Sequence, residues 1–376
     1  MNTKFSNLKI IIFAVIFGLG AGIVGQMLAT AYFLPQEIFI TSEGSRAKQT
    51  VIQTAENEKI LEAAKNTLPA ILEIFPKKNS SHNPENQIYL PNERIALGTA
   101  LTSDGWIVSF VGEKIGEKIF DFKNNSVVVT GDQKIFEPKK IILDQATGTV
   151  FIKIETDNLS VPKLGSGENI SLGEKVLTLR NKQSFRTMRT VDLFYEPIAA
   201  PKDLLRSSEK FSKFILLDQS LAQNEVGAPL INLSGEIVGI ISDTSPVVAV
   251  PINFWRNAFL EILKTETAGR PYLGVHYFDL GNSPGINEAL SQGKTAGALI
   301  WSDKNLKIVG VAKNSPAAIS GLKDGDVITK INNENLSQKT DLSKIIAQYS
   351  PADKIQITIL RNGEEKLVEV TLGEEI

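Results

Sequence analysis

The first hydrophobic pattern is an apolar run at the N-terminus, where only Gln26 and Thr30 are polar between Ile10 and Leu34. A helix needs about 20 apolar residues to cross a bilayer. We therefore predict a short cytoplasmic tip and one transmembrane helix over residues 1–34. The polar residues 35–55 that follow are predicted to be a tether.

The charges around this run predict its orientation. Lys4 and Lys9 precede it, and no comparable positive cluster follows it. By the positive-inside rule, the body of the chain then lies outside the cytoplasm, in the periplasm or on the cell surface. The alternative is a cleaved signal peptide, because Ala29-Thr30-Ala31 is similar to a cleavage site. The sequence leaves cleavage at Ala31 open.

The next 200 or so residues change from a helical pattern to short β-branched runs. Glu56 to Leu68 has helical spacing, which Pro69 is expected to end. Short strands between turn signals then predict a mainly β domain of antiparallel sheets or barrels. The strands are expected at Ala96–Thr102, Trp106–Val111, Ser126–Thr130, Ile141–Ile142, Val150–Ile154, Val176–Leu179, Val191–Phe194, Phe214–Leu217 and Ile237–Ile241, with a hairpin turn at Ser234-Gly235.

A helix at Asn253–Lys264 is predicted to close this first domain, over residues 56–264. Residues 265–270 are polar and are expected to be a linker. Residues 271–376 alternate strand and helix patterns, which predicts a second, α+β domain. Its strands are expected near Tyr272–His276, Ala298–Trp301, Ile308–Val311, Val327–Ile331, Ile355–Leu360 and Leu367–Leu372, and its helices at Ala317–Ser320 and Asp341–Tyr349.

Composition excludes several kinds of chemistry. The chain has 376 residues, a formal net charge of −2, no Cys and two His. Without Cys there is no disulfide, thiolate metal site or cysteine nucleophile. Near-zero net charge argues against nucleic acid as a partner. No cofactor and no metal site is predicted.

The C-terminal domain carries the most specific motif. It reads Ser315-Pro316-Ala317-Ala318, then Gly321-Leu322-Lys323-Asp324-Gly325-Asp326-Val327-Ile328, then Ile331-Asn332. This order resembles the core of bacterial PDZ domains. The upstream Tyr272-Leu273-Gly274-Val275 resembles their carboxylate-binding loop. The resemblance implies a domain that binds peptide C-termini.

The first domain resembles the protease domain of the HtrA (Deg) family of chymotrypsin-fold serine proteases. The matching pieces are Asp104–Val108, Asp144–Ile154, Ile170–Val176, Gly227–Asn232 and Gly235–Ile240, in the family's order. With the PDZ motif, the resemblance covers about four-fifths of the chain. It implies a chymotrypsin-like double β-barrel followed by a PDZ domain, and assembly into trimers.

The family's catalytic triad falls on residues that cannot catalyse. Its His, Asp and Ser positions correspond to Gly112, Gly148 and Val226. Glycine and valine side chains neither attack a carbonyl nor accept a proton. The Gly-Asn that shapes the oxyanion loop is replaced by Asn224-Glu225. No catalytic residue is therefore predicted, and the chain resembles an inactive member.

Alternative catalytic groups have little support. The two histidines are His82, in a polar loop, and His276, beside the carboxylate loop, so neither is expected to be a catalytic base. A Ser–Lys pair remains possible in principle, but no spacing singles one out. A carboxylate at Glu225 would repel an oxyanion, and an exposed Glu225 is the alternative interpretation.

Peptide binding is the activity that the PDZ resemblance leaves intact. An extended peptide adds to a sheet edge, and backbone N–H groups hold its terminal carboxylate. Gly274 suits such a loop because glycine permits close backbone approach. The far wall is expected to be the helix with Leu342, Ile345, Ile346 and Tyr349 at helical spacing. Some of these four must face the core instead.

Three functions follow. The first is a membrane-anchored pseudoprotease that binds C-terminal or unfolded peptides of exported proteins, as scaffold, holdase or regulator in envelope quality control. It would act as a homotrimer or in mixed oligomers with an active relative. The second is a serine endopeptidase with a displaced catalytic apparatus. The third is a structural envelope protein whose PDZ groove is occupied internally.

Overall fold

The computed structural model describes Gly18, Ala21 and residues 56–79, 83–110, 119–167, 170–181, 184–338 and 340–375. The chain divides into two compact units, Met1–Glu58 and Lys59–Ile376. Within the described residues, no helix is long and apolar enough to cross a membrane. The predicted transmembrane segment lies outside them, apart from Gly18 and Ala21, which are both helical and exposed.

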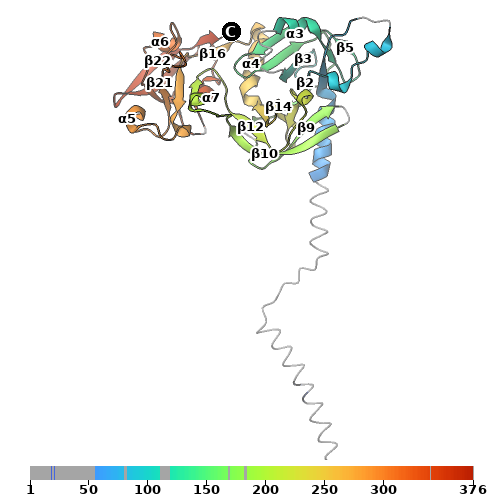
Figure 1. Ribbon diagram of the computed structural model, residues 1–376, viewed down its shortest axis with the longest axis horizontal. Helices are drawn as coiled ribbons and strands as arrows, with labels where there is room; N and C mark the ends of the chain where they lie inside the picture. The colour runs from blue at the N-terminus through green and yellow to red at the C-terminus, as the bar shows by residue number, and fades with distance from the viewer. Residues whose placement is uncertain are drawn as a thin grey trace, which may run out of the picture. The chain divides into compact units, whose positions relative to one another are not determined.

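The second unit begins with a short helix and a seven-stranded sheet (Figure 1). Residues 56–67 are helical, and a 3-10 turn at Leu68–Ala70 follows, with Pro69 inside it. The sheet has the order β5-β4-β1-β2-β3-β7-β6, with antiparallel pairing throughout. Its strands are β1 (Ile71–Pro76), β2 (Ala96–Ala100), β3 (Trp106–Phe110), β4 (Ser126–Val129), β5 (Ile135–Phe136), β6 (Lys140–Asp144) and β7 (Thr149–Lys153), and α3 (Ile119–Asn125) precedes β4.

A second seven-stranded sheet has the order β13-β9-β10-β12-β15-β14-β8. Its strands are β8 (Lys163–Leu164), β9 (Lys175–Asn181), β10 (Ser184–Tyr195), β12 (Phe214–Leu217), β13 (Pro229–Ile231), β14 (Glu236–Thr244) and β15 (Val247–Pro251). Helix α4 (Ile252–Thr265) follows and packs on β14 and β15. It joins the two sheets because Phe259 stacks on Phe151 of β7, with ring centroids 5.7 Å apart. One apolar cluster thus contains residues of both sheets.

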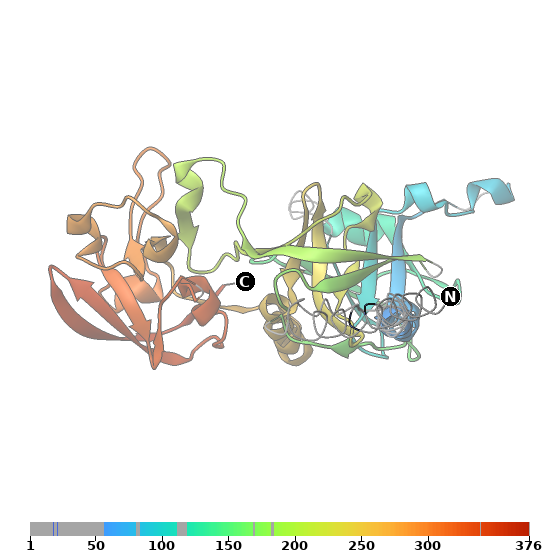
Figure 2. The same ribbon diagram turned by 90° about the horizontal axis from the view of Figure 1, so that it is seen from below.

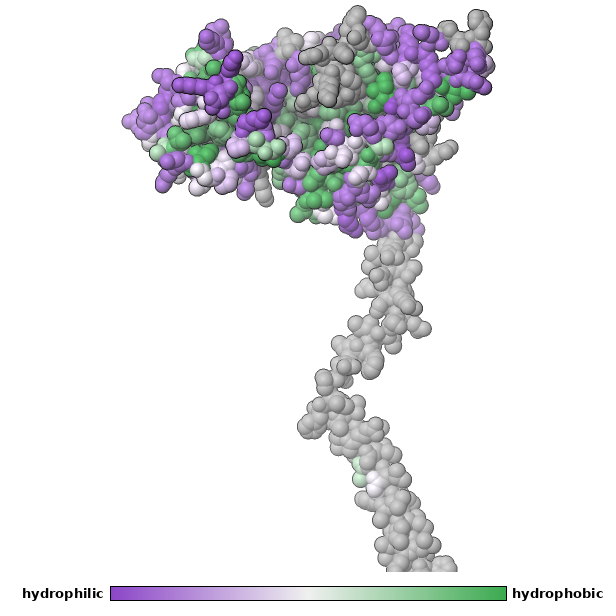
Figure 3. Space-filling view, viewed as in Figure 1, coloured by the Kyte–Doolittle hydropathy of each residue, from purple (hydrophilic) through white to green (hydrophobic). Residues whose placement is uncertain are grey.

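The third large sheet belongs to the C-terminal part and has the order β11-β17-β18-β19-β21-β22, with β20 beside β19. Its elements are β11 (Leu205–Ser207), β17 (His276–Asp279), β18 (Ala298–Ile300), β19 (Val327–Ile331), β20 (Glu334–Asn335), β21 (Lys354–Arg361) and β22 (Glu364–Thr371), with helices α5 (Glu288–Ser291), α6 (Pro316–Ile319) and α7 (Leu342–Ile346). Strands β16 (Arg270–Tyr272) and β23 (Gly373–Glu375) form a separate pair. On the face shown in Figure 3, hydrophilic residues surround smaller apolar patches.

Most predicted elements are confirmed. Strands β12 and β19 have the predicted bounds, the helix at 253–264 is α4, and the hairpin turn lies between β13 and β14. Three predictions are wrong. Tyr272–His276 is not one strand, since a loop separates β16 from β17; Ile308–Val311 forms only isolated bridges; and the last helix ends at Ile346 rather than Tyr349.

An ion pair ties the predicted linker to the first sheet. Arg270 donates from Nε to Asp144 Oδ1 at 2.7 Å, and its Nη2 contacts both Asp144 Oδ2 and the carbonyl of Phe254. Asp144 is 1% exposed and Arg270 7%. Bidentate geometry satisfies both buried charges. Arg270, the last residue of the predicted linker, is thus buried and ion-paired.

We expect Arg270→Ala to lower the free energy of unfolding by about 3–5 kcal/mol, because it leaves the buried Asp144 carboxylate without its cation. Chemical denaturation of the purified chain measures this. Lys140→Ala is the matched control: it also removes a cation from an ion pair, with Glu266 at 2.8 Å, but both partners are exposed. Equal destabilisation by the two substitutions would contradict the prediction.

Candidate functional site

The two described positions that the sequence aligns with the triad Asp and Ser, Gly148 and Val226, are both buried. Gly148 is buried and has φ +73°, and its N–H donates to Asp144 O at 2.8 Å. A Cβ at residue 148 would come within 2.9 Å of the Phe110 ring. Val226 is 6% exposed within the same apolar cluster as Phe110. Gly112 lies outside the described residues.

The loop directly before Val226 forms a closed turn. Gln223–Glu225 is a 3-10 helix, and the Val226 N–H donates to Gln223 O at 3.4 Å. Glu225 is 2% exposed. Its carboxylate accepts from Ala222 N at 2.7 Å and pairs with Arg180 Nε at 3.1 Å. The interpretation of Glu225 as an exposed residue is therefore wrong: its carboxylate is buried and caps the turn.

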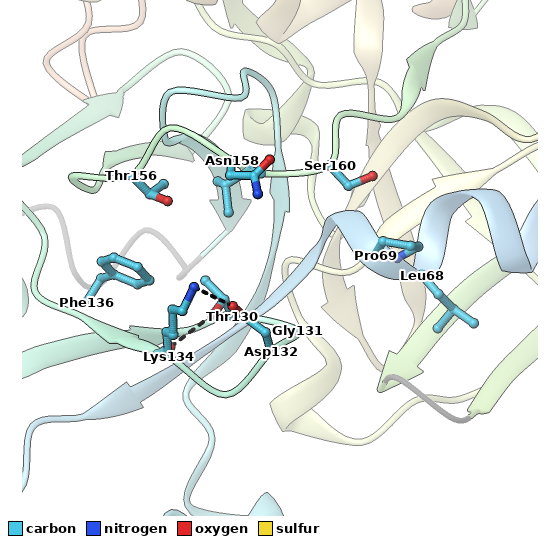
Figure 4. Close-up of a pocket in the computed structure, with 11 residues that line it drawn as sticks. Leu68, Pro69, Thr130, Gly131, Asp132, Lys134, Phe136, Thr156, Asn158 and Ser160 are labelled. Carbon is cyan, nitrogen blue, oxygen red and sulfur yellow. Dashed lines mark hydrogen bonds and ion pairs between the residues drawn. The ribbon is translucent and has the colours of Figure 1, made fainter.

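A cavity of about 540 Å³ lies on the first sheet, apart from these positions (Figure 4). Lys134 and Ser160 both line it, so this cavity is a candidate for a catalytic Ser–Lys pair. The Lys134 ammonium pairs with Asp132 at 2.8 Å, and this hydrogen bond raises the pKa of Lys134. The same contact lowers the pKa of Asp132 to about 2. A catalytic lysine needs a lowered pKa, so the cavity lacks an activated base.

The described residues hold one histidine and no metal site. The His276 ring Nδ1 lies 2.9 Å from Val309 O in the C-terminal domain. His82 lies outside the described residues. No group of three His, Asp or Glu side chains converges to hold a metal ion in the part of the chain that the structure describes.

The loop Tyr272-Leu273-Gly274-Val275 joins β16 to β17 and presents two backbone donors. Gly274 has φ +83°, and a Cβ there would lie 2.4 Å from Ser315 Cβ, so the position requires glycine. The N–H groups of Leu273 and Gly274 both donate to one carboxylate oxygen, Glu209 Oε1, at 3.1 and 2.8 Å. The predicted carboxylate loop thus holds a carboxylate, supplied by this chain.

Strand β11 covers the edge of β17 beside this loop (Figure 2). The pairing is antiparallel, with Leu205 opposite Phe278 and Ser207 opposite His276. Ser208 continues the ladder: its N–H donates to Val275 O at 2.9 Å, and its Oγ accepts from Val275 N at 3.1 Å. We call residues 196–213, between β10 and β12, the strap. The strap occupies the edge of β17 beside the predicted carboxylate loop.

A buried cluster of charges fixes the strap. Arg206 Nη1 donates to Asp279 Oδ2 at 2.8 Å and to Asp341 Oδ2 at 3.4 Å, and Nη2 pairs with Glu196. Lys213 Nζ pairs with Asp341 at 2.9 Å. All five side chains are at most 10% exposed.

Two of the three acids that contact Arg206 have pKa values shifted in opposite directions. Burial raises the pKa of Glu196 against the charge of Arg206. Burial opposes ionisation of Asp341 too, but Lys213 and Arg206 hold its pKa below the ordinary value. Asp341 is therefore ionised in the folded protein, and the two cations beside it, Lys213 and Arg206, belong to the strap.

The helix predicted as the far wall is part of the C-terminal core. Leu342, Ile345 and Ile346 are at most 1% exposed and pack with the sheet, whereas Tyr349 is partly buried. Because β11 covers the edge of β17, the peptide-binding role of Leu342, Ile345 and Ile346 stays a prediction. Sequence reasoning missed Arg206 and Glu209, because neither belongs to a motif and the strap lacks strand periodicity.

Comparisons with known proteins agree with the two-part organisation. The family described as PDZ domain matches residues 271–372. The chain is 26% identical over 316 residues to the serine endoprotease DegS of Haemophilus influenzae, covering 81% of this chain and 85% of that protein. It is 24% identical to a probable periplasmic DegP-like serine endoprotease of Pseudomonas putida, over 81% of this chain but 62% of that protein's length.

Solved structures show the same fold. The HtrA-type protease AlgW with a decapeptide matches with a TM-score of 0.60 and 20% identity, over 84% of this chain and 98% of that one. This likeness covers both the paired sheets and the C-terminal domain, which are the trypsin-like and PDZ parts. The chain is therefore similar to serine proteases of the HtrA/Deg family, and it has a trypsin-like protease fold followed by a PDZ domain.

Proposed function

We propose that the chain is a pseudoprotease of the HtrA/Deg family that binds peptides or protein C-termini through its PDZ domain. The observation that carries the proposal is the pair of N–H groups of Leu273 and Gly274, which hold a carboxylate beside the pairing edge of β17. This is the arrangement by which a PDZ domain captures a chain terminus. The ligands would be C-terminal or unfolded segments of exported proteins.

Loss of proteolysis is supported by three features. The triad positions are Gly112, Gly148 and Val226. Phe110 fills the space in front of Gly148, and the Glu225 carboxylate lies buried next to Val226. A buried anion at this point would repel a developing oxyanion, where catalysis needs aligned donors.

The location and assembly are part of the proposal. The apolar run at residues 10–34 would anchor the protein as a single-pass membrane protein with its body outside the cytoplasm. There it would act as a scaffold, holdase or regulator in envelope protein quality control. It would form homotrimers or mixed oligomers with an active relative.

The competing function is a serine endopeptidase with a displaced catalytic apparatus. Its support is that relatives such as DegS of Haemophilus influenzae are named endoproteases. An activated serine, wherever it lies, reacts with a fluorophosphonate, whereas a peptide-binding protein does not.

We expect the purified chain neither to cleave unfolded casein from mildly acidic to mildly basic pH nor to take up a fluorophosphonate probe, because no base lies beside a nucleophile at the triad positions. Gel electrophoresis and in-gel fluorescence measure the two. Cleavage that persists through further purification and is abolished by a single Ser→Ala change would overturn the proposal.

Restoring the acid of the triad is expected to destabilise the protein. Gly148→Asp adds a Cβ 2.9 Å from the Phe110 ring, and overpacking costs about 1–3 kcal/mol. Gly173→Asp is the control, because Gly173 has φ +76° but no neighbour within 4 Å. Chemical denaturation should show the larger loss for Gly148→Asp. Equal losses of unfolding free energy would mean that the Phe110 side chain can move and that the site has room for an acid.

The topology is checked with protease added to intact spheroplasts. We expect digestion of the C-terminal domain, since Lys4 and Lys9 retain the N-terminus in the cytoplasm. A tag at the N-terminus should survive until the inner membrane is lysed. Protection of the C-terminal domain in intact spheroplasts would reverse the topology.

A further inference from the structure

We infer that the strap is a built-in ligand of the PDZ groove, and that the ligands which displace it carry a basic residue two positions before a free C-terminal carboxylate. The inference rests on the proposed peptide-binding function. It names the class of peptide and the internal segment with which that peptide competes.

The strap satisfies the hydrogen-bonding requirement of the β17 edge. Strand β11 is the outermost member of the C-terminal sheet, although its flanking strands β10 and β12 belong to another sheet. Without β11, the N–H and C=O groups of β17 that face it would be unpaired, which is the condition under which an extended segment adds to a sheet. The strap is therefore bound in the manner of a peptide ligand.

Glu209 stands where a chain terminus would lie. Its Oε1 accepts from Leu273 N at 3.1 Å and from Gly274 N at 2.8 Å, and the hydroxyls of Ser207 and Ser208 also donate to its carboxylate. A terminal carboxylate has the same charge and the same two oxygen acceptors. The side chain of Glu209 thus imitates the group that the loop is built to hold.

The ladder register sets the position of the terminal residue of a ligand. Ser208 pairs with Val275, the last residue of the carboxylate loop, and is the last strap residue in this ladder. A peptide whose own carboxylate replaces that of Glu209 therefore ends at the Ser208 position. Its residue two positions earlier takes the place of Arg206, opposite Tyr277.

The Arg206 position is acidic on the groove side. Asp279, at the end of β17, and Asp341, the N-cap residue of α7, are both about 3% exposed and both accept from Arg206. When β11 leaves, Arg206, which donates to both acids, leaves with it. A buried anion without a cation is strongly destabilising, so an incoming peptide must bring a cation to this place.

The strap lowers the apparent affinity for any external peptide. A groove that is free only in a fraction of molecules binds with an affinity reduced by that fraction. Coupling of this kind commonly amounts to about 5- to 150-fold. Affinity should rise when the strap is released and vanish when the strap is locked in place.

Because the chain has no Cys, two introduced cysteines can form a single disulfide that locks the strap onto β17. Ser207 and His276 are ladder partners, and antiparallel partners have Cα atoms about 4.5–5.5 Å apart, within the range of a disulfide. The full-length Ser207→Cys/His276→Cys variant can be compared oxidised and reduced. His276→Cys alone is the control, since it alters the groove in the same way without a bond.

The release variant is Arg206→Glu/Glu209→Lys, which reverses both charges by which the strap holds the groove. Lys202→Ala is its control, because Lys202 is an exposed strap residue outside these contacts. The probe is a fluorescent peptide of residues 200–208 with a free carboxylate at Ser208. Two further peptides carry Ala at the Arg206 position or a C-terminal amide. Fluorescence anisotropy measures binding to each full-length protein.

We expect the release variant to bind the probe about tenfold or more tightly than the wild type and Lys202→Ala. The oxidised lock should bind about tenfold or more weakly than its reduced form, and the reduced form should match His276→Cys. The Ala and amide peptides should bind the release variant about tenfold or more weakly than the probe. Circular dichroism checks its fold, and the oxidised–reduced pair decides the question if it is unfolded.

The unfavourable outcomes separate the two proposals. Equal affinity in wild type, release variant and both forms of the lock would overturn the inference while leaving peptide binding in place. Equal affinity for the probe and its Ala version would overturn the basic specificity. Absence of binding by the folded release variant to all three peptides would overturn the proposed function and the inference together.

Discussion

The structure of the groove depends on one electrostatic constraint, the need of two buried carboxylates for a cation. Asp279 and Asp341 are both about 3% exposed and share the guanidinium of Arg206. Removing one partner of such a buried pair costs about 3–5 kcal/mol, far more than an exposed pair contributes. The strap is therefore held in a defined register, and a ligand that replaces it must meet the same demand. Asp279 and Asp341 thus account both for the closure of the groove by the strap and for the selectivity of the groove for a basic ligand.

In the trypsin-like part, the described positions that align with the triad lie in apolar packing. A triad requires open space between a base and a nucleophile, with backbone donors directed into it. Here Phe110 lies against Gly148, and Val226 belongs to the core that joins the two sheets. These side chains bury apolar surface, which stabilises the domain.

The fold was largely predictable because it depends on local patterns. Strand periodicity, turn residues and motif order located the hairpin at Ser234-Gly235, helix α4 and the carboxylate loop around Gly274. The strap was not predictable, since three residues of β11 are too few for a periodic signal and their partner strand lies some 70 positions away in the chain. Arg206 and Glu209 acquire their roles only through contacts that form once both domains are folded.

The position of the strap in the chain gives the groove a connection to the protease-like fold. The strap is flanked by β10 and β12. These two strands pair with each other, and they also pair with β9 and β15, respectively. Binding of a peptide at β17 must release the segment that joins β10 to β12, so the free energy of ligand binding and that of strap docking are linked. Linkage is reciprocal: whatever holds the strap, including a partner bound to these strands, weakens peptide binding by the same factor. The strap can therefore transmit the presence of a ligand from the PDZ domain to the trypsin-like domain.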